Sequence, residues 1–252
     1  MATSAPATTR LIVSARCERL TVDGQIEAWA FGEPGRPLVF VQHGLGSRKE
    51  RMLELALRLA EARYRAVAVD APAHGDRRNP ESSARLADPE NPEFVPFLMG
   101  IVQLAADDLG RVAGALGETR WAVAGHSLGG RIALDALHRH PGTVCAAAIG
   151  APFGDQLLPD NLPPLWRERI DAAEPRRNPH RYAPRPVLLA HAADDPVTPA
   201  SGSRAVAEAL REAYPLGSGL PVHVEIPTGG HDLVPELQEA VVGFMTVHFP
   251  AP

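Results

Sequence analysis

Residues 121–130 place a serine between an apolar run and a helical pattern, and no other stretch of the sequence constrains the fold as much. The run Trp-Ala-Val-Ala leads into Gly125-His-Ser127-Leu-Gly129, and the helical pattern begins at Leu128. A serine in G-x-S-x-G occupies a sharp, strained strand-to-helix turn, and the two glycines leave the space that this turn needs. The pattern therefore predicts a strand, a tight turn and a helix, with Ser127 at the carboxyl end of the strand as a nucleophile.

Apolar runs of strand length alternate with helical patterns along the chain. Strands are expected at 11–13, 26–31, 38–41, 66–69, 121–124, 144–149, 187–190 and 222–226. Helices are expected at 50–62, 97–116, 128–139, 200–214 and 234–248, and a long loop at 71–96. Repeated strand–helix units predict the α/β class, with a mostly parallel central sheet flanked by helices in a single domain, 1–252.

Residues 151–185 separate two expected strands and contain seven prolines, with one short amphipathic stretch at 165–170. We interpret about 153–185 as a minimal lid over a pocket, since the segment is too short for a domain. Its arginines could attract an anionic acyl group or a coenzyme A phosphate, whereas its acidic residues favour a solvated surface. The arginines are Arg167, Arg169, Arg176, Arg177, Arg181 and Arg185, and the acidic residues are Glu168, Asp171 and Glu174.

The charge balance and the absence of long apolar runs exclude several classes of partner. Twenty-five basic and 30 acidic residues give a net charge of −5, so we expect binding to neither nucleic acid nor an anionic membrane. No run of eighteen apolar residues occurs, and the first ten residues do not resemble a signal peptide. Cys17 and Cys145 lie in apolar segments and are expected to be reduced. We therefore expect a cytoplasmic protein, and the sequence indicates no oligomeric state.

A serine nucleophile needs a histidine base and donors for an oxyanion. His231 stands in a glycine-rich loop between the last expected strand and helix, which favours it as the base. The backbone N–H groups of Leu45 and Leu128 are the candidate oxyanion donors, whereas His43 beside the first of them is interpreted as structural. Neither an H-E-x-x-H motif nor a Cys/His cluster occurs, so no metal is expected.

From about residue 25 to 249 the sequence resembles the α/β-hydrolase fold family. The motifs that carry the resemblance are His43-Gly44, Asp70 with His74-Gly75-Asp76-Arg77, Gly125-His-Ser127-Leu-Gly129, Asp194-Asp195-Pro-Val-Thr-Pro199 and Gly230-His231-Asp232. Within the family, the chain looks most like small bacterial dienelactone-hydrolase-like and prolyl-oligopeptidase-like serine esterases. The resemblance implies an esterase that needs no cofactor and cleaves small carboxylic esters through an acyl-enzyme on Ser127.

The resemblance also implies an acidic third member of the triad, after the strand at 187–190. The family pattern small-x-x-Asp-Pro-Val-x-Pro aligns with Asp195, although Ala192 replaces the usual glycine. Pro196 supports this register because it favours an extended backbone at the residue before it. Asp194 is then a solvated loop residue, and Asp155, after the preceding strand, is the remaining alternative.

The same constellation serves other reactions, because the site rather than the fold determines the chemistry. An acyl-coenzyme A thioesterase or a lactonase on the same triad is therefore the alternative function. A protein that binds a ligand without catalysis is a more remote alternative, since such proteins usually lack a member of the triad.

Overall fold

The computed structural model describes residues 17–153, 162–218 and 220–252. One sheet has the strand order β1-β2-β4-β3-β5-β6-β7-β8, in which only the β1–β2 and β2–β4 pairs are antiparallel. The strands are β1 (Cys17–Val22), β2 (Ile26–Phe31), β3 (Leu38–Gln42), β4 (Arg65–Val69), β5 (Trp121–His126), β6 (Thr143–Ile149), β7 (Val187–Ala192) and β8 (Val222–Ile226). The mostly parallel sheet predicted from the sequence is confirmed.

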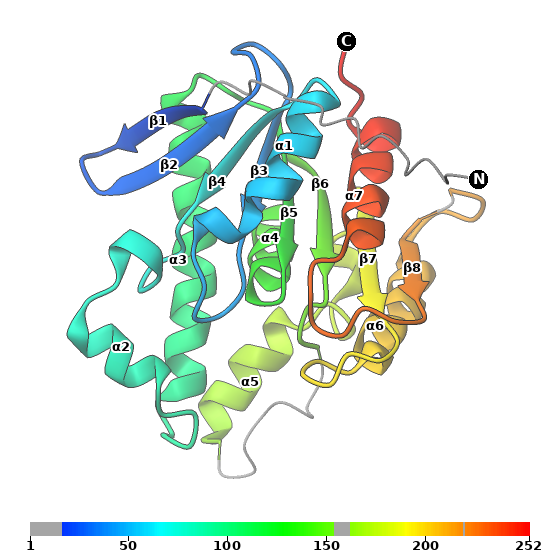
Figure 1. Cartoon of the computed structure of the whole chain (residues 1–252). Helices are drawn as coiled ribbons and strands as arrows, with labels where there is room; N and C mark the ends of the chain where they lie inside the picture. Colours follow the sequence, from blue (N-terminus) through cyan, green and yellow to red (C-terminus); the bar gives the residue numbers. More distant parts are fainter. Residues whose placement is uncertain (1–16, 154–161, 219) are drawn as a thin grey trace, which may run out of the picture.

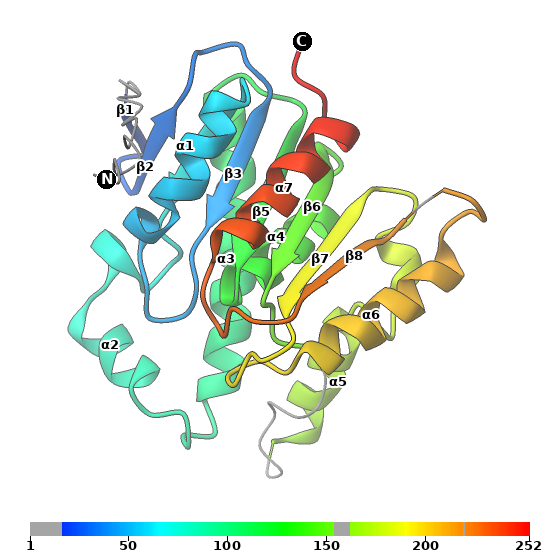
Figure 2. The same cartoon turned by 45° about the vertical axis from the view of Figure 1, so that its right-hand side comes forward.

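Helices cover both faces of this sheet (Figures 1 and 2). The α-helices are α1 (Leu53–Glu61), α2 (Pro80–Leu86), α3 (Phe94–Ala115), α4 (Leu128–Arg139), α5 (Pro164–Ala173), α6 (Ala200–Ala213) and α7 (Pro235–His248). Short 3-10 helices are η1 (Lys49–Met52), η2 (Gly75–Arg77) and η4 (Pro179–Arg181). Among the described residues, no helix is both long and apolar enough to cross a membrane.

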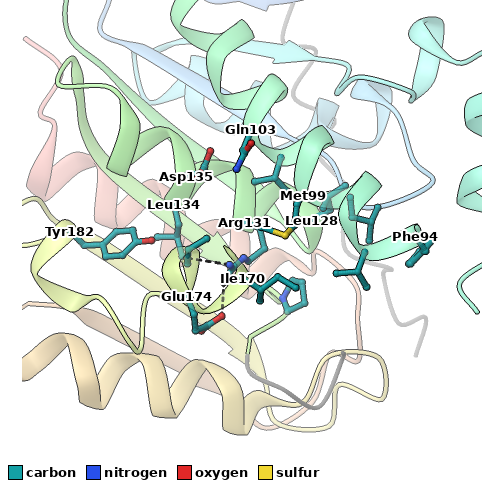
Figure 3. Close-up of a pocket in the computed structure, with 15 residues that line it drawn as sticks. Phe94, Met99, Gln103, Leu128, Arg131, Leu134, Asp135, Ile170, Glu174 and Tyr182 are labelled. Carbon is teal, nitrogen blue, oxygen red and sulfur yellow. Dashed lines mark hydrogen bonds and ion pairs between the residues drawn. The ribbon is translucent and has the colours of Figure 1, made fainter. Parts of the chain in front are cut away.

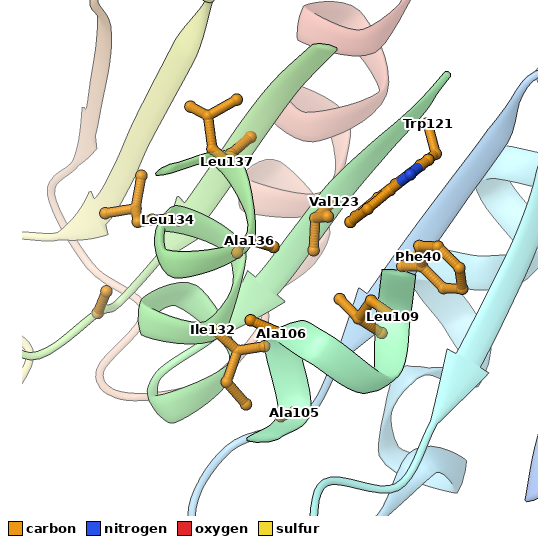
Figure 4. Packing of buried hydrophobic residues seen from close by; sticks show 14 of the residues in the cluster. Phe40, Ala105, Ala106, Leu109, Trp121, Val123, Ile132, Leu134, Ala136 and Leu137 are labelled. Carbon is orange, nitrogen blue, oxygen red and sulfur yellow. The ribbon is translucent and has the colours of Figure 1, made fainter. Parts of the chain in front are cut away.

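Side chains that alternate along the strands divide the core into two layers. Phe40 and Val123 face the helices α3, α4 and α6, whereas Val39 and Val41 face α1 and α7. Figure 4 shows the first layer, in which Phe40 packs edge-on against Trp121 with ring centroids 5.2 Å apart. Parallel strands buried on both faces are expected to be continuously apolar, as β3 is. Packing in both layers therefore holds the strands in place, including their carboxyl ends, where the candidate site lies.

Some expected elements differ from the observed ones. The strand expected at 11–13 lies outside the described residues, and β1 was not predicted. The loop expected at 71–96 contains η2 and α2, and α3 begins at Phe94 rather than at residue 97. The side chain of Asn79 accepts a hydrogen bond from the Ser82 N–H, forming a capping box that starts α2. Cys17 is exposed, contrary to the apolar setting expected for it, and Cys145 is buried.

Candidate active site

The turn at Ser127 has the strained backbone that the sequence pattern predicts. Its φ of 55° and ψ of −119° lie outside the regions that non-glycine residues usually occupy. A Cβ on Gly125 would overlap the carbonyl oxygen of Gly129, and one on Gly129 would overlap that of Gln42. The N–H of Ser127 donates to the carbonyl oxygen of Ile149, 2.7 Å away on β6. These contacts hold the serine between the end of β5 and the start of α4.

The structure brings the three residues expected to form the triad into one chain of hydrogen bonds. Ser127 Oγ lies 2.9 Å from His231 Nε2, and His231 Nδ1 lies 2.7 Å from Asp195 Oδ2. Ser127 follows β5, Asp195 follows β7 and His231 follows β8. An imidazole that donates from Nδ1 to a carboxylate leaves Nε2 free to accept the serine proton, so this arrangement can generate a nucleophile.

The carboxylate of Asp195 is buried and held by several donors. Its Oδ1 accepts the N–H groups of Val197 and Thr198 at 2.8 and 2.9 Å, and its Oδ2 lies 3.0 Å from the Thr198 hydroxyl. Burial acts to raise the pKa of Asp195, but the hydrogen bonds from His231, Thr198 and Val197 outweigh it, so the net pKa is lowered. The carboxylate is therefore charged wherever His231 can act as a base.

Of the two alternative acids, Asp194 does not occupy this position. Asp194 is exposed, as expected, but its Oδ1 also accepts the N–H groups of Gly229 and Gly230 at 2.9 and 2.8 Å. It thereby anchors the loop that carries His231, a contact that the sequence did not indicate. Asp155 lies outside the described residues.

Leu45, one expected oxyanion donor, lines the same cavity as Ser127 and His231. This cavity, called here the serine cavity, has a volume of about 220 Å³. Its other lining residues are Gly44, Ser47, Arg51, Met52, His126, Asp232 and Leu233. The second expected donor, Leu128, is the first residue of α4, where the helix dipole favours negative charge.

His43 joins the loops that follow β3 and β4. It is fully buried, its Nδ1 lies 2.8 Å from the Gly44 carbonyl oxygen, and its Nε2 accepts the Ala71 N–H at 3.1 Å. Burial lowers the pKa of His43 to about 4, so the ring is neutral at pH 7. These contacts give His43 the structural role expected from the sequence.

Lys49 was missed by sequence reasoning, although it is the only lysine in the chain. Its side chain is 1% exposed, and its ammonium contacts the carboxylates of Asp70, at 2.8 Å, and Asp76. The other oxygen of Asp70 accepts the Lys49 N–H at 2.7 Å. A buried charge needs such partners, so this cluster ties η1, just after the loop with Leu45, to the loops after β4. That the sequence contains a single lysine was the signal that could have drawn attention to Lys49.

A second cavity of about 180 Å³, called here the apolar cavity, lies between α3, α4 and α5 (Figure 3). Leu128 and Pro152 line it and connect it to the ends of β5 and β6. The remaining lining residues are Phe94, Val95, Leu98, Met99, Val102, Gln103, Arg131, Leu134, Asp135, Ile170, Ala173, Glu174 and Tyr182. The expected amphipathic stretch 165–170 thus lies in α5, which forms one wall of a pocket.

Arg131, on α4, joins this helix to the carboxyl end of α5. Its guanidinium donates to Glu174 Oε2 at 3.2 Å and to the Ala173 carbonyl oxygen at 3.4 Å, and it lies over the ring of Phe153. Arg131 and Glu174 both line the apolar cavity and compensate each other's charge, so Arg131 is not an unpaired cation there.

Three lid arginines are engaged with the protein itself. Arg177 donates to Asp171 at 2.9 Å, Arg181 to the carbonyl oxygen of Ala172 at 2.6 Å, and Arg185 to that of His140 at 3.2 Å. These contacts favour the structural interpretation of the lid charges over an anion site.

A mostly parallel sheet with a strained serine turn at the end of β5, joined by hydrogen bonds to a histidine and an aspartate, defines the α/β-hydrolase class. The family model described as serine aminopeptidase, S33, matches residues 33–181, more than half of the chain, and the protein belongs to this family of α/β hydrolases. A second model, described as TAP-like protein, matches residues 165–249.

Individual relatives agree with this assignment. Esterase YjfP of Escherichia coli (strain K12) is 29% identical over 245 residues, covering 88% of this chain and 94% of that protein. The crystal structure of TT1662 from Thermus thermophilus is 26% identical, with a TM-score of 0.78, and the match covers 95% of this chain and all of that one. The enol-lactonase from Burkholderia xenovorans LB400, 18% identical with a TM-score of 0.63 and covering 91% and 100% of the two chains, shares the fold.

Proposed function

We propose that the protein is a serine hydrolase that cleaves carboxylic esters through an acyl-enzyme on Ser127. The observation that carries this proposal is the unbroken chain of hydrogen bonds from Ser127 Oγ through His231 to Asp195. The relative named as an esterase, which aligns over most of this chain, supports an ester as the substrate class.

In the proposed reaction, Nε2 of His231 takes the proton of Ser127 while Oγ attacks the ester carbonyl carbon. Asp195 stabilises the imidazolium that forms and holds its Nδ1–H. The N–H groups of Leu45 and Leu128 would donate to the oxyanion, and one such donor is typically worth about 3 kcal/mol. His231 then protonates the departing alcohol. Water, deprotonated by His231, attacks the acyl-enzyme and releases the acid and free Ser127.

The two cavities suit the two halves of an ester. His231 must reach the oxygen of the leaving alcohol, so the alcohol belongs on the side of the serine cavity, which His231 lines. The acyl chain is then directed into the apolar cavity beyond Leu128. Mostly apolar walls favour an unbranched or otherwise apolar acyl group.

No specific observation favours the alternatives over an ester. A coenzyme A thioester would need cations for its phosphates, and three of the six arginines at 151–185, Arg177, Arg181 and Arg185, donate to acceptors of the protein itself. The lactonase among the solved structures resembles this chain only at the level of fold. A role in binding without catalysis would leave the strain at Ser127 and the contact with His231 without a purpose.

The test is turnover of p-nitrophenyl esters of graded acyl length, beside lactones and acyl thioesters, by the native protein and Ser127→Ala. We expect the variant to keep its fold and lose almost all ester turnover, with labelling by a fluorophosphonate lost as well. A folded Ser127→Ala with more than about a tenth of native kcat would exclude Ser127 as the nucleophile. Absence of labelling in the native protein would favour the binding role.

A further inference from the structure

A second histidine contacts the carboxylate of Asp195. The ring of His191, at the carboxyl end of β7, is fully buried, and its Nε2 lies 3.2 Å from Asp195 Oδ2. The same nitrogen lies 2.7 Å from the carbonyl oxygen of Thr198, and Nδ1 lies 2.7 Å from the hydroxyl oxygen of Ser203 on α6. A row of groups therefore runs from α6 through His191 to the proposed triad.

The partners of His191 assign its tautomer. The Thr198 carbonyl oxygen can only accept, so Nε2 must carry a hydrogen, and in the neutral ring Nδ1 accepts from the Ser203 hydroxyl. The Nε2–H group then donates to the Thr198 carbonyl oxygen and lies beside Asp195 Oδ2, which is 3.2 Å from the nitrogen. It faces the same carboxylate oxygen that binds Nδ1 of His231 at 2.7 Å.

We propose that His191 is a positioning residue for the reaction, which fixes Thr198 and the carboxylate of Asp195 and weakens the hold of that carboxylate on protonated His231. This proposal rests on the proposed function. Thr198 donates its N–H to Asp195 Oδ1 and places its hydroxyl 3.0 Å from Oδ2, so a donor that fixes Thr198 also fixes the acid. An N–H group whose nitrogen lies 3.2 Å from Oδ2 also reduces the negative potential there, so its removal should move the acid limb of the pH–rate profile to higher pH.

Other titratable groups lie around the triad, and the His191 variants described below retain all of them. Burial, with the nearby His231, lowers the pKa of His126 to about 4, so His126 does not titrate in the range of the assay. Burial lowers the pKa of His223, while Arg204 holds that of Glu225 down. The groups facing His231 are Asp195, His126, Asp232 and Arg51, and those nearest His191 from β8 and α6 are His223, Glu225 and Arg204.

The experiment compares the pH dependence of kcat/KM for one short-chain p-nitrophenyl ester between about pH 5 and 8.5. His191→Leu removes the Nε2–H donor and the Nδ1 acceptor and should lower kcat about tenfold and move the acid limb up by about half a pH unit or more. His191→Gln keeps an N–H donor near the position of Nε2 and should restore the native limb. Ser203→Ala should give a smaller shift in the same direction. His223→Leu, on the neighbouring strand, is the matched control and should give none.

An acid limb that stays at the native pH in folded His191→Leu would overturn the proposal, even if kcat falls, because a purely structural histidine predicts that result. A shift in His191→Gln as large as in His191→Leu would overturn it as well. If His191→Leu does not fold, Ser203→Ala decides in the same way, with no shift as the negative result. Full turnover by Ser127→Ala would instead refute the proposed function, so the two failures are distinguishable.

Discussion

Replacing Asp195 by asparagine exchanges one oxygen for an NH₂ group and preserves the shape of the side chain. Oδ1 of Asp195 accepts the N–H groups of Val197 and Thr198 at 2.8 and 2.9 Å. The asparagine must keep its carbonyl oxygen there, because its NH₂ group would otherwise face two donors. The NH₂ group then faces Nδ1 of His231, which has to become an acceptor, and the ring proton moves to Nε2.

An Nε2 atom that carries a proton cannot accept another from Ser127 Oγ, 2.9 Å away. In most molecules of the variant, Ser127 must therefore attack without a base that takes its proton. Inversion of the tautomer in this kind of triad costs about 10⁴ in kcat, equivalent to about 5.5 kcal/mol in the activation free energy. The two cavities proposed to hold the ester are untouched, so we expect KM to change little.

Steady-state turnover of a short-chain p-nitrophenyl ester measures this loss, with unfolding by urea as the check on stability. Asp194→Asn is the matched control, because it changes the adjacent carboxylate and keeps an oxygen for the N–H groups of Gly229 and Gly230. We expect it to change kcat less than tenfold. A large loss in Asp194→Asn with nearly native kcat in Asp195→Asn would refute the assignment of the acid and leave the serine in place.

Lys49→Met should lower the free energy of unfolding by about 3–5 kcal/mol, measured in urea, because it leaves the carboxylate of Asp70 buried without its cation; a loss under 1 kcal/mol would contradict this. Met99→Trp should fill part of the apolar cavity and lower kcat/KM for an octanoate ester more than tenfold relative to an acetate ester; equal effects on both would place the acyl chain elsewhere. The pKa values of His43 and His126 are lowered to about 4, so the unfolded chain takes up protons below pH 6.5 before the folded protein does, and stability falls with falling pH. From these two rings we expect a loss of about 2 kcal/mol each between pH 7 and 5 in urea unfolding, and His126→Gln should lessen the native loss by about 2 kcal/mol; an unchanged pH dependence in this variant would contradict the lowered pKa of His126 in the fold.

The elements predicted correctly are those whose pattern is local and strong. β3 and β5 are continuously apolar, and α4 follows a turn that its own glycines specify. β1 was missed because its residues are mostly exposed, so neither alternation nor an apolar run marks it. α2 was missed because prolines in the region suggested a loop, whereas Asn79 and Ser82 carry the capping signal. The sequence contained that capping signal, but whether so short a helix forms depends on the residues it packs against.

Of the proposed site, Ser127 and His231 could be placed from motif context, and Asp195 from the register of the proline that follows it. The contacts of Lys49 with Asp70 and of His191 with Ser203 could not be predicted. These pairs are separated by 21 and 12 residues, and only the packing of neighbouring strands and helices brings them together. Local patterns indicate which residues can react, but the sheet determines which buried polar groups support them.

The proposed chemistry depends on loops that are held by groups which take no part in it. Ser127 is fixed by the carbonyl oxygen of Ile149, the loop of His231 by Asp194, and the η1 segment by the ion pair of Lys49. A hydrogen bond of 2.7–2.9 Å tolerates little displacement, and a shift of about 1 Å can cost 10²-fold in rate. Substitutions at these anchors should therefore lower kcat more than they lower the fraction of protein that is folded. Substitutions in the two core layers should lower both together.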